Sequence, residues 1–142
     1  MPIYRSNAGD TALVSLDEDD DLLDGLTRVA GELAIQAGSV QVIGAVKKLV
    51  LGYYDQDERE YRMLEPGGHF EIASGLGNIS LKDGAPFVHL HVVASDESGA
   101  ALGGHVMPGN VVFAAEAWIS VLSADTLPER HPEERRGLAL WG

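Results

Sequence analysis

Hydrophobic and polar residues alternate along most of this chain, and such alternation predicts β-strands with one buried face. In the clearest case, residues 87–93, apolar side chains point to one side and two imidazoles, His89 and His91, point to the other. Similar patterns predict further strands at 11–16, 40–46, 49–54, 60–64, 69–74, 78–82 and 111–122. Polar or Gly-rich turns separate most of them, so the pattern favours β-hairpins.

One segment follows a helical period instead. Apolar residues recur at three- and four-residue steps over 22–34, directly after the acidic run 17–21. An aspartate at the end of that run can cap the first free N–H groups, and its charge is favourable at the positive end of a helix. Gly38 stands where a left-handed C-terminal cap belongs. The pattern predicts one helix over about 21–37.

The predicted strand 111–122 is apolar on both faces, which is unusual for a sheet with one wet side. One face is formed by Val111, Phe113, Ala115, Ala117, Ile119 and Val121, and the other, which includes Glu116 and Trp118, is only slightly polar. A single helix covers only part of a sheet this large. We therefore expect a subunit interface to cover the remainder, in a homo-oligomer.

A second short strand is predicted after the turn that follows residue 94. In this strand Leu102 and Val106 point to one face and His105 points to the opposite face. If the apolar pair joins the buried face, His105 must emerge beside His89 and His91. Opposed Cβ atoms on adjacent strands lie about 4.5–5.5 Å apart, so the imidazoles can converge on one ion. Three neutral histidines with a position left open suit a divalent transition metal, Zn²⁺ first.

The alternative is that these histidines are ordinary structural or surface residues, because an H-x-H pair also arises by chance. His69 and His131 lack comparable neighbours and are interpreted as structural or solvated. Glu71 or Glu116 could serve as a partner of the ligands or as a general base beside metal-bound water. Glu71 could equally be an ordinary sheet carboxylate paired with a basic residue, and for Glu116 this ordinary role is the favoured interpretation.

Length and composition indicate one soluble globular domain. The chain has 142 residues, 45% of them hydrophobic, enough for one domain over 1–142 that ends in a C-terminal tail, 124–142. It contains no cysteine, which excludes disulfides and thiolate metal sites. No apolar run is long enough for a membrane helix, and no signal-like segment begins the chain, so the expected location is the cytoplasm.

Acidic residues dominate the charge. Ten Lys and Arg stand against 22 Asp and Glu, a formal net charge of −12. Such a chain repels phosphate at long range unless a local basic patch overcomes the field. The candidates are the pair 47–48 and the group Arg130, Arg135 and Arg136, interrupted by glutamates, and we interpret both as solvated surface. Direct binding to DNA or an anionic membrane is therefore disfavoured.

The order of these motifs resembles the PPC domain, the "plants and prokaryotes conserved" domain, over about residues 10–123. The matching features are the acidic entry to one helix, Gly38-Ser-Val, Ile43-Gly-Ala-Val46, Gly52-Tyr-Tyr-Asp55, Glu60-Tyr61, Gly68-His-Phe-Glu-Ile72, Gly77-Asn-Ile-Ser80, His89-Leu-His91, Gly103-Gly-His105, Pro108-Gly109 and the Glu116 strand. The resemblance implies an α/β (α+β) domain with a mainly antiparallel sheet, one principal helix and a homotrimeric assembly.

For function, the resemblance implies two things. Plant members join this domain to Arg-Gly-Arg-Pro AT-hooks, and prokaryotic members are often labelled as DNA-binding on that basis, whereas some look like metal proteins that use the three histidines. This chain has no Arg-Gly-Arg-Pro, and His69 stands where the family commonly has Arg. Three functions stay open: a trimeric metal protein or metal-dependent enzyme with a small-molecule ligand, a regulatory protein acting on DNA, and an oligomerisation module.

Overall fold

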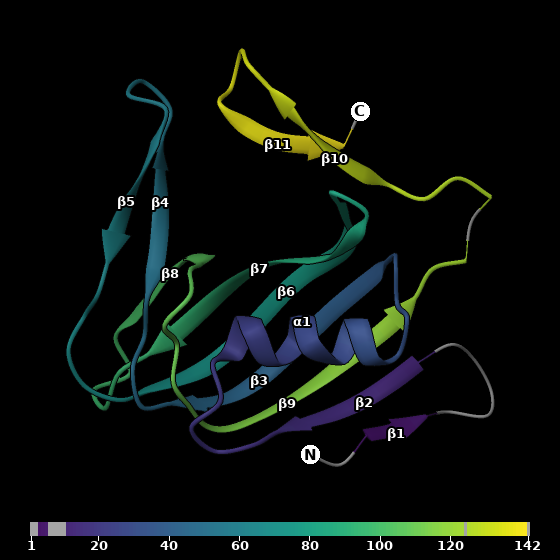
Figure 1. Ribbon diagram of the computed structural model, residues 1–142. Coiled ribbons are helices and arrows are strands. Elements are labelled where there is room, and N and C mark those ends of the chain that lie inside the picture. Colours follow the sequence, from purple (N-terminus) through teal and green to yellow (C-terminus); the bar gives the residue numbers. More distant parts are fainter. Residues whose placement is uncertain (1–2, 6–10, 124, 142) are drawn as a thin grey trace.

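The computed structural model describes residues 3–5, 11–123 and 125–141. They form an 11-stranded sheet with the helix α1 (Leu22–Glu32) against one face (Figure 1). The strands are β1 (Ile3–Arg5), β2 (Thr11–Leu16), β3 (Gly38–Val46), β4 (Leu51–Asp55), β5 (Glu60–Leu64), β6 (Phe70–Lys82), β7 (Ala85–Ser95), β8 (Ala101–Val106), β9 (Val112–Val121), β10 (Glu129–Glu133) and β11 (Leu138–Trp141). Within these residues, no helix is long and apolar enough to cross a membrane.

The sheet runs in the order β1-β2-β9-β3-β6-β7-β8-β4-β5, and neighbours on this path are antiparallel. The predicted hairpins β4–β5 and β7–β8 are confirmed. A further hairpin, β10–β11, lies off the path, with β10 parallel to β6. A mostly antiparallel sheet with one helix among the described residues is thus the observed fold, as the resemblance implied.

The core lies between α1 and the sheet. Its fully buried side chains include Leu22, Leu26 and Val29 of the helix and Val40, Val42, Ile79, Leu90 and Ile119 of the strands. Because alternate residues of β2, β3, β7 and β9 enter this core, the others point away from α1 and form an outer face. The functional side chains considered below lie on that outer face.

The helix begins as predicted. Asp21 is the N-cap, and its Oδ1 accepts hydrogen bonds from the N–H groups of Leu23 and Asp24, each 2.9 Å long. Arg28 donates to Asp20 across 2.7 Å, which ties the acidic run to the helix surface. The acidic run therefore serves helix entry.

The predicted end of the helix is wrong. The helix ends at Glu32, because Ala34 adopts a left-handed φ of 54° and the Ile35 N–H donates to Ala30 O at 2.8 Å. This is a Schellman-type end in which alanine occupies the position usually taken by glycine. Burial of Ile35, only 2% exposed, favours the early turn. Gly38 instead opens β3, where a Cβ would lie 2.5 Å from a carbonyl oxygen of β9.

The predicted break between strands 69–74 and 78–82 is also wrong, because β6 continues through Gly75 and Gly77. These glycines allow close packing inside the sheet. A Cβ on Gly77 would lie 2.2 Å from the carbonyl oxygen of His89. The glycines therefore hold β6 and β7 in register beneath the histidines.

Strand β9 differs from its predicted alternation at one end. The register between β3 and β9 shifts at Ala45/Val46, a β-bulge. As a result Val112 is buried and Phe113 is 58% exposed, although Phe113 was predicted to join the apolar face. The remainder of that face is buried as expected at Ala115, Ala117 and Ile119.

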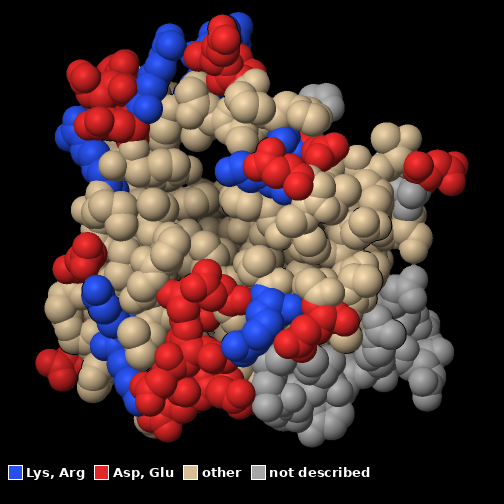
Figure 2. Space-filling model, viewed as in Figure 1, with Lys and Arg blue, Asp and Glu red and all other residues tan. Residues whose placement is uncertain are grey.

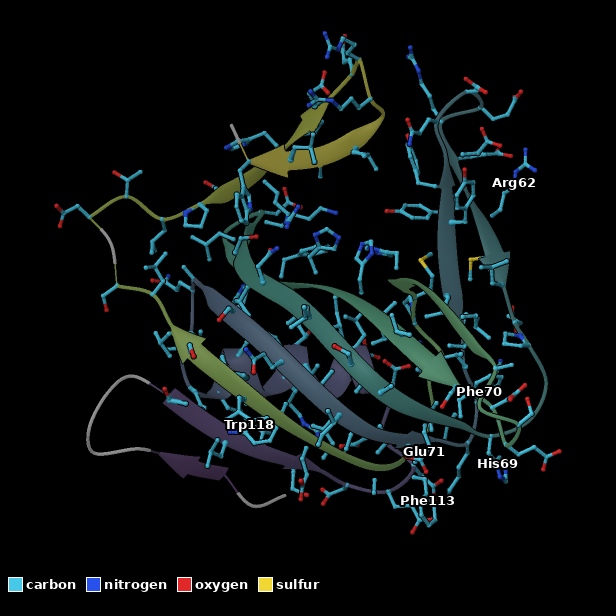
Figure 3. All side chains as sticks on the ribbon, turned by 180° about the vertical axis from the view of Figure 1, so that it is seen from behind. Arg62, His69, Phe70, Glu71, Phe113 and Trp118 are labelled. Carbon is cyan, nitrogen blue, oxygen red and sulfur yellow. The ribbon has the colours of Figure 1, made fainter. Side chains whose placement is uncertain are left out.

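The outer face carries large apolar side chains that nothing covers among the described residues of one chain. They are Leu13, Ile43, Leu76, Val93 and Trp118, each at least 38% exposed. Figure 3 shows Trp118 on this side of the sheet. A row of directly paired residues crosses this face from Leu13 through Trp118, Gln41 and Leu76 to His91 and His105. The apolar surface thus leads straight to the histidines.

Candidate metal centre

Strand parity brings the three predicted histidines together. Alternate residues Val88, Leu90 and Val92 of β7 are buried, which leaves His89 and His91 on the outer face. The prediction that Leu102 and Val106 of β8 join the buried face is confirmed as well. Val106 of β8 is buried and Leu102 packs against the core. His105 therefore points outward, directly opposite His91 in the β7–β8 register.

The ring nitrogens of these histidines nearly touch. His89 Nε2 lies 3.2 Å from His91 Nε2, and His105 Nδ1 lies 3.4 Å from the same His91 nitrogen. One nitrogen from each ring lies within 4.8 Å of the other two. Two nitrogens bound at about 2.0–2.1 Å to a tetrahedral Zn²⁺ lie about 3.3–3.4 Å apart. The distances from His91 Nε2 to the other two ring nitrogens therefore match those of nitrogens that share an ion.

Hydrogen bonding alone does not satisfy this arrangement. An uncharged imidazole nitrogen carries either one proton or one lone pair, so His91 Nε2 makes at most one good hydrogen bond. Two other ring nitrogens nevertheless face it. A cation placed between the rings accepts a lone pair from each of them. The donor set is the one that Zn²⁺ and its neighbouring divalent ions prefer.

The surroundings keep two of the rings uncharged. Burial lowers the pKa of His89 from 6.5 to about 4, and the charges of Arg130 and His91 add to the effect. Burial also lowers the pKa of His105 to about 4, aided by His89, His91 and Arg130. Both rings are neutral at pH 7, which is the state that ligates a metal.

These pKa values predict an acid-sensitive apo protein. Unfolded histidines bind protons near pH 6.5, whereas His89 and His105 do so only near pH 4 in the fold. Between these values the unfolded state binds more protons, so stability falls as the pH drops from 6.5 to 4. Solvent screening of these partly exposed rings limits the expected loss to about 2 kcal/mol. Urea unfolding of metal-free protein measures it, and a His89→Gln/His105→Gln variant should lose clearly less; equal losses would contradict this account.

Arg130 of β10 supports the cluster from behind, and its interpretation as solvated surface is wrong. It is only 7% exposed, and its Nη2 lies 3.3 Å from His89 Nδ1. The same guanidinium donates to Ser80 Oγ at 2.9 Å, Asn78 Oδ1 at 2.8 Å and the Ala139 carbonyl at 3.1 Å. The charged residues around Arg130 in the sequence do not indicate that its side chain is buried. The placement depends on the long-range β10–β6 pairing, which the sequence pattern does not indicate.

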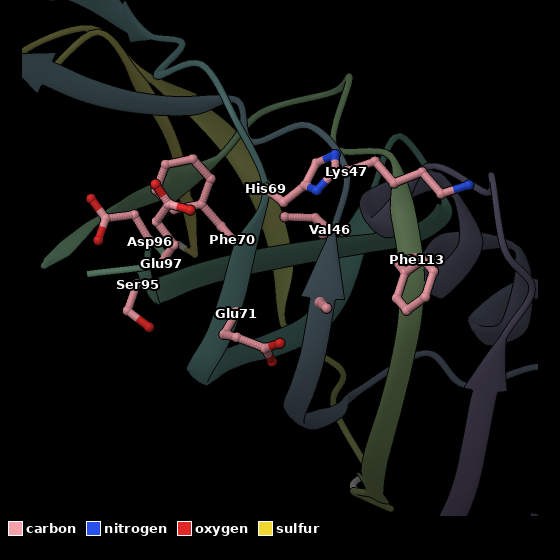
Figure 4. Close-up of a pocket in the computed structure, with 10 residues that line it drawn as sticks. Val46, Lys47, His69, Phe70, Glu71, Ser95, Asp96, Glu97 and Phe113 are labelled. Atoms are coloured by element: carbon pink, nitrogen blue, oxygen red, sulfur yellow. The ribbon is translucent and has the colours of Figure 1, made fainter. Parts of the chain in front are cut away.

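The structure places Glu71 and His69 elsewhere. Both line a cavity of about 440 Å³ at the far end of the sheet from the β10–β11 hairpin, together with Asp96, Phe113 and other residues (Figures 3 and 4). Lys47 at its edge pairs with Glu18 and Asp19 of the acidic run. Glu116 lies on β9, two strands away from β6. The histidine cluster is therefore assembled without either glutamate.

Comparison with protein families gives the chain a place among known domains. Residues 4–123 match the model of the Plants and Prokaryotes Conserved (PCC) domain, also abbreviated PPC. This chain belongs to that family. The PCC match includes all three histidines but ends before Arg130.

Solved structures agree with the PCC assignment. A PPC protein of Pyrococcus horikoshii is 36% identical, with a TM-score of 0.89 over 94% of this chain and 92% of that one. A metal-containing protein of Archaeoglobus fulgidus is 38% identical, with a TM-score of 0.88 over 99% of both chains. A candidate DNA-binding protein of Bacteroides thetaiotaomicron shares the fold at 24% identity, with a TM-score of 0.88 over 99% of this chain and 96% of that one.

A curated relative contains a similar segment within a much longer chain. The bifunctional protein GlmU of Synechococcus sp. (strain JA-3-3Ab) is 30% identical over 118 residues. The match covers 82% of this PCC-domain chain but 18% of GlmU. The chain thus spans less than a fifth of that relative, and the similarity concerns this domain alone.

Proposed function

We propose that this PCC-domain protein is a homotrimeric metal-binding protein in which His89, His91 and His105 hold one divalent transition ion, with Zn²⁺ the first candidate. The observation that carries the proposal is the convergence of three ring nitrogens, within 4.8 Å of one another. The 38% identical metal-containing protein of Archaeoglobus fulgidus supports it. Three ligands leave a coordination position for water or a small molecule.

The residues around the cluster suit such an ion. Ligation through His89 Nε2 places the ring proton on Nδ1, which then needs an acceptor. Asn78 is the direct cross-strand neighbour of His89, and its Oδ1 already accepts from Arg130 beside that nitrogen. When bound, a divalent ion supplies a Lewis acid and a water of lowered pKa. The proposal assigns no catalytic base, because Glu71 lines a different cavity.

Trimer formation is supported by the uncovered outer face. Its apolar row has Trp118 toward one end and the histidines at the other. A cyclic assembly joins two different patches of neighbouring subunits, so such an extended row suits a ring of copies. The resemblance to PPC domains favours three. In this arrangement a neighbouring subunit would lie close to the metal site.

Direct DNA binding is the weaker candidate. With 22 acidic against ten basic residues, the chain repels phosphate. On the face seen in Figure 2, acidic groups separate the basic ones, and no continuous basic patch forms among its described residues. Lys47 is also neutralised by Glu18 and Asp19. Any action on DNA would need a partner protein or a basic surface formed between subunits.

Elemental analysis of protein purified without a polyhistidine tag tests the metal proposal. We expect about one divalent transition ion per chain, removed by dialysis against chelator and restored by Zn²⁺. Metal-free protein that neither takes up Zn²⁺ nor gains thermal stability with it would contradict the proposal. It would leave the oligomerisation module as the better description.

A further inference from the structure

Arg130 is a buried cation without a carboxylate partner among the described residues. Each of its hydrogen bonds goes to a neutral acceptor, namely a hydroxyl, an amide oxygen and a backbone carbonyl, and its Nη2 also lies beside the His89 ring. Arginine keeps its charge in proteins, and burial of an unpaired charge is costly. The structure therefore holds a fixed positive charge beside His89, and a balancing negative charge would be favourable there.

Aromatic rings fix this guanidinium in place. Its carbon lies 5.2 Å from the centroid of the Phe87 ring and 5.5 Å from that of Trp141. Cation–π attraction to both rings offsets part of the burial cost but supplies no net negative charge. Arg130 is thus a preorganised charge rather than a mobile surface side chain.

The histidines lie at the base of a hollow between two hairpins. On the β4–β5 side, the Tyr61 ring lies 5.0 Å from that of His105. On the β10–β11 side, Arg130 contacts His89. The hairpins meet where Tyr54 Oη donates to the Arg136 carbonyl at 2.5 Å. In Figure 1 both hairpins lie above the sheet, β4–β5 next to β8 and β10–β11 next to the C-terminal end of β6, and Figure 2 shows the surface hollowed between them. The two hairpins thus flank the imidazoles on two sides.

The hollow carries positive charge in a strongly acidic protein. No Asp or Glu side chain contacts the three imidazoles or Arg130 within the described residues. A metal-ligating histidine donates its other ring N–H to a carboxylate, a backbone carbonyl or water, and of these only a carboxylate balances part of the ion's charge. A divalent ion here would instead have a guanidinium one imidazole ring away.

We propose that the open coordination position takes an oxyanion, the carboxylate or phosphate group of a small anionic ligand, and that Arg130 is the positioning residue that selects its charge. Arg130 acts through its electrostatic field, since Ser80, Asn78 and the Ala139 carbonyl hold three of its five donors and fix the guanidinium behind His89. This inference rests on the proposed metal site and adds the chemical class of its ligand. By linkage, such an anion also tightens metal binding.

Co²⁺-loaded protein provides the test, because the visible bands of bound Co²⁺ report its coordination. Acetate and inorganic phosphate are titrated separately into wild type, Arg130→Gln and the control Arg135→Gln, which removes the same charge from an exposed position of the same hairpin. We expect at least one anion to shift the bands, the Arg130→Gln variant to bind it about tenfold more weakly, and the control to stay within about twofold. The anion that shifts the bands identifies carboxylate or phosphate.

The possible failures are distinguishable. Absence of Co²⁺ bands in wild type would overturn the metal site and this inference together. Normal bands that ignore both anions, or equal anion affinity in Arg130→Gln, would overturn the inference alone. If Arg130→Gln does not fold, Arg130→Lys keeps the charge and should bind the anion within about threefold of wild type. A tenfold loss in Arg130→Lys would overturn the role of charge.

Discussion

Replacing His91 with alanine is expected to abolish metal binding, because His91 Nε2 is the nitrogen that both other rings face. Its removal leaves two ligands on different strands and opens a gap at the centre of the cluster. We expect the Zn²⁺ content to fall from about one ion per chain to near zero. Chelator should lower the melting temperature of wild type but not of the variant. At free metal about 100 times Kd, the lost stabilisation is about 2.7 kcal/mol.

His131→Ala is the matched control, since His131 is an exposed histidine outside the cluster. Both variants lack one imidazole, so they differ in the position of the loss and not in histidine content. Inductively coupled plasma mass spectrometry gives the metal content, and differential scanning calorimetry gives the melting temperature. Retention of Zn²⁺ by His91→Ala at the wild-type level would show that the ion, if any, is held elsewhere.

Replacing Trp118 with glutamate is expected to dissociate the proposed trimer into single chains. Trp118 is 42% exposed and sits within the apolar outer face, where Leu13 and Gln41 are its direct neighbours. A charge buried there against another subunit would be unpaired, which costs several kcal/mol at each contact. The mass by light scattering should fall from three times 15.1 kDa to that of one chain.

Tyr53→Glu is the corresponding control for the interface. Tyr53 is 60% exposed, but its neighbour Gly52 pairs with His105, so strand parity turns Tyr53 away from the outer face. This variant should keep the wild-type mass. A wild-type protein with the mass of a single chain at micromolar concentration would contradict the trimer. An unchanged mass in folded Trp118→Glu would show that the interface does not include Trp118.

The histidine cluster was predictable because it depends on local alternation. Once Val88, Leu90 and Val92 are placed in a core, the direction of His89 and His91 follows. His105 needed one more step, the assumption that β8 pairs beside β7 after a short turn, and adjacency of consecutive strands is the common outcome.

The errors arose where backbone geometry overrides residue preference. Ala34 ends the helix in a conformation usually reserved for glycine, because the burial of Ile35 requires the turn there. The bulge beside Val46 turns Phe113 to the exposed face of the sheet. The alternation of apolar and polar residues does not indicate such an extra residue. Arg130 depends on contacts between distant segments, which spacing along the chain does not encode.

The ligand triad and its neighbouring charge belong to separate stretches of the chain. The histidines lie inside the region shared with the PCC family, whereas Arg130 comes from a C-terminal hairpin whose pairing with β6 involves only Glu129 and Arg130. The backbone pairing of this hairpin with the sheet is therefore short. Chains with the same three histidines could therefore differ in how strongly they attract anions. The presence of the histidines alone does not determine which class of ligand the metal site binds.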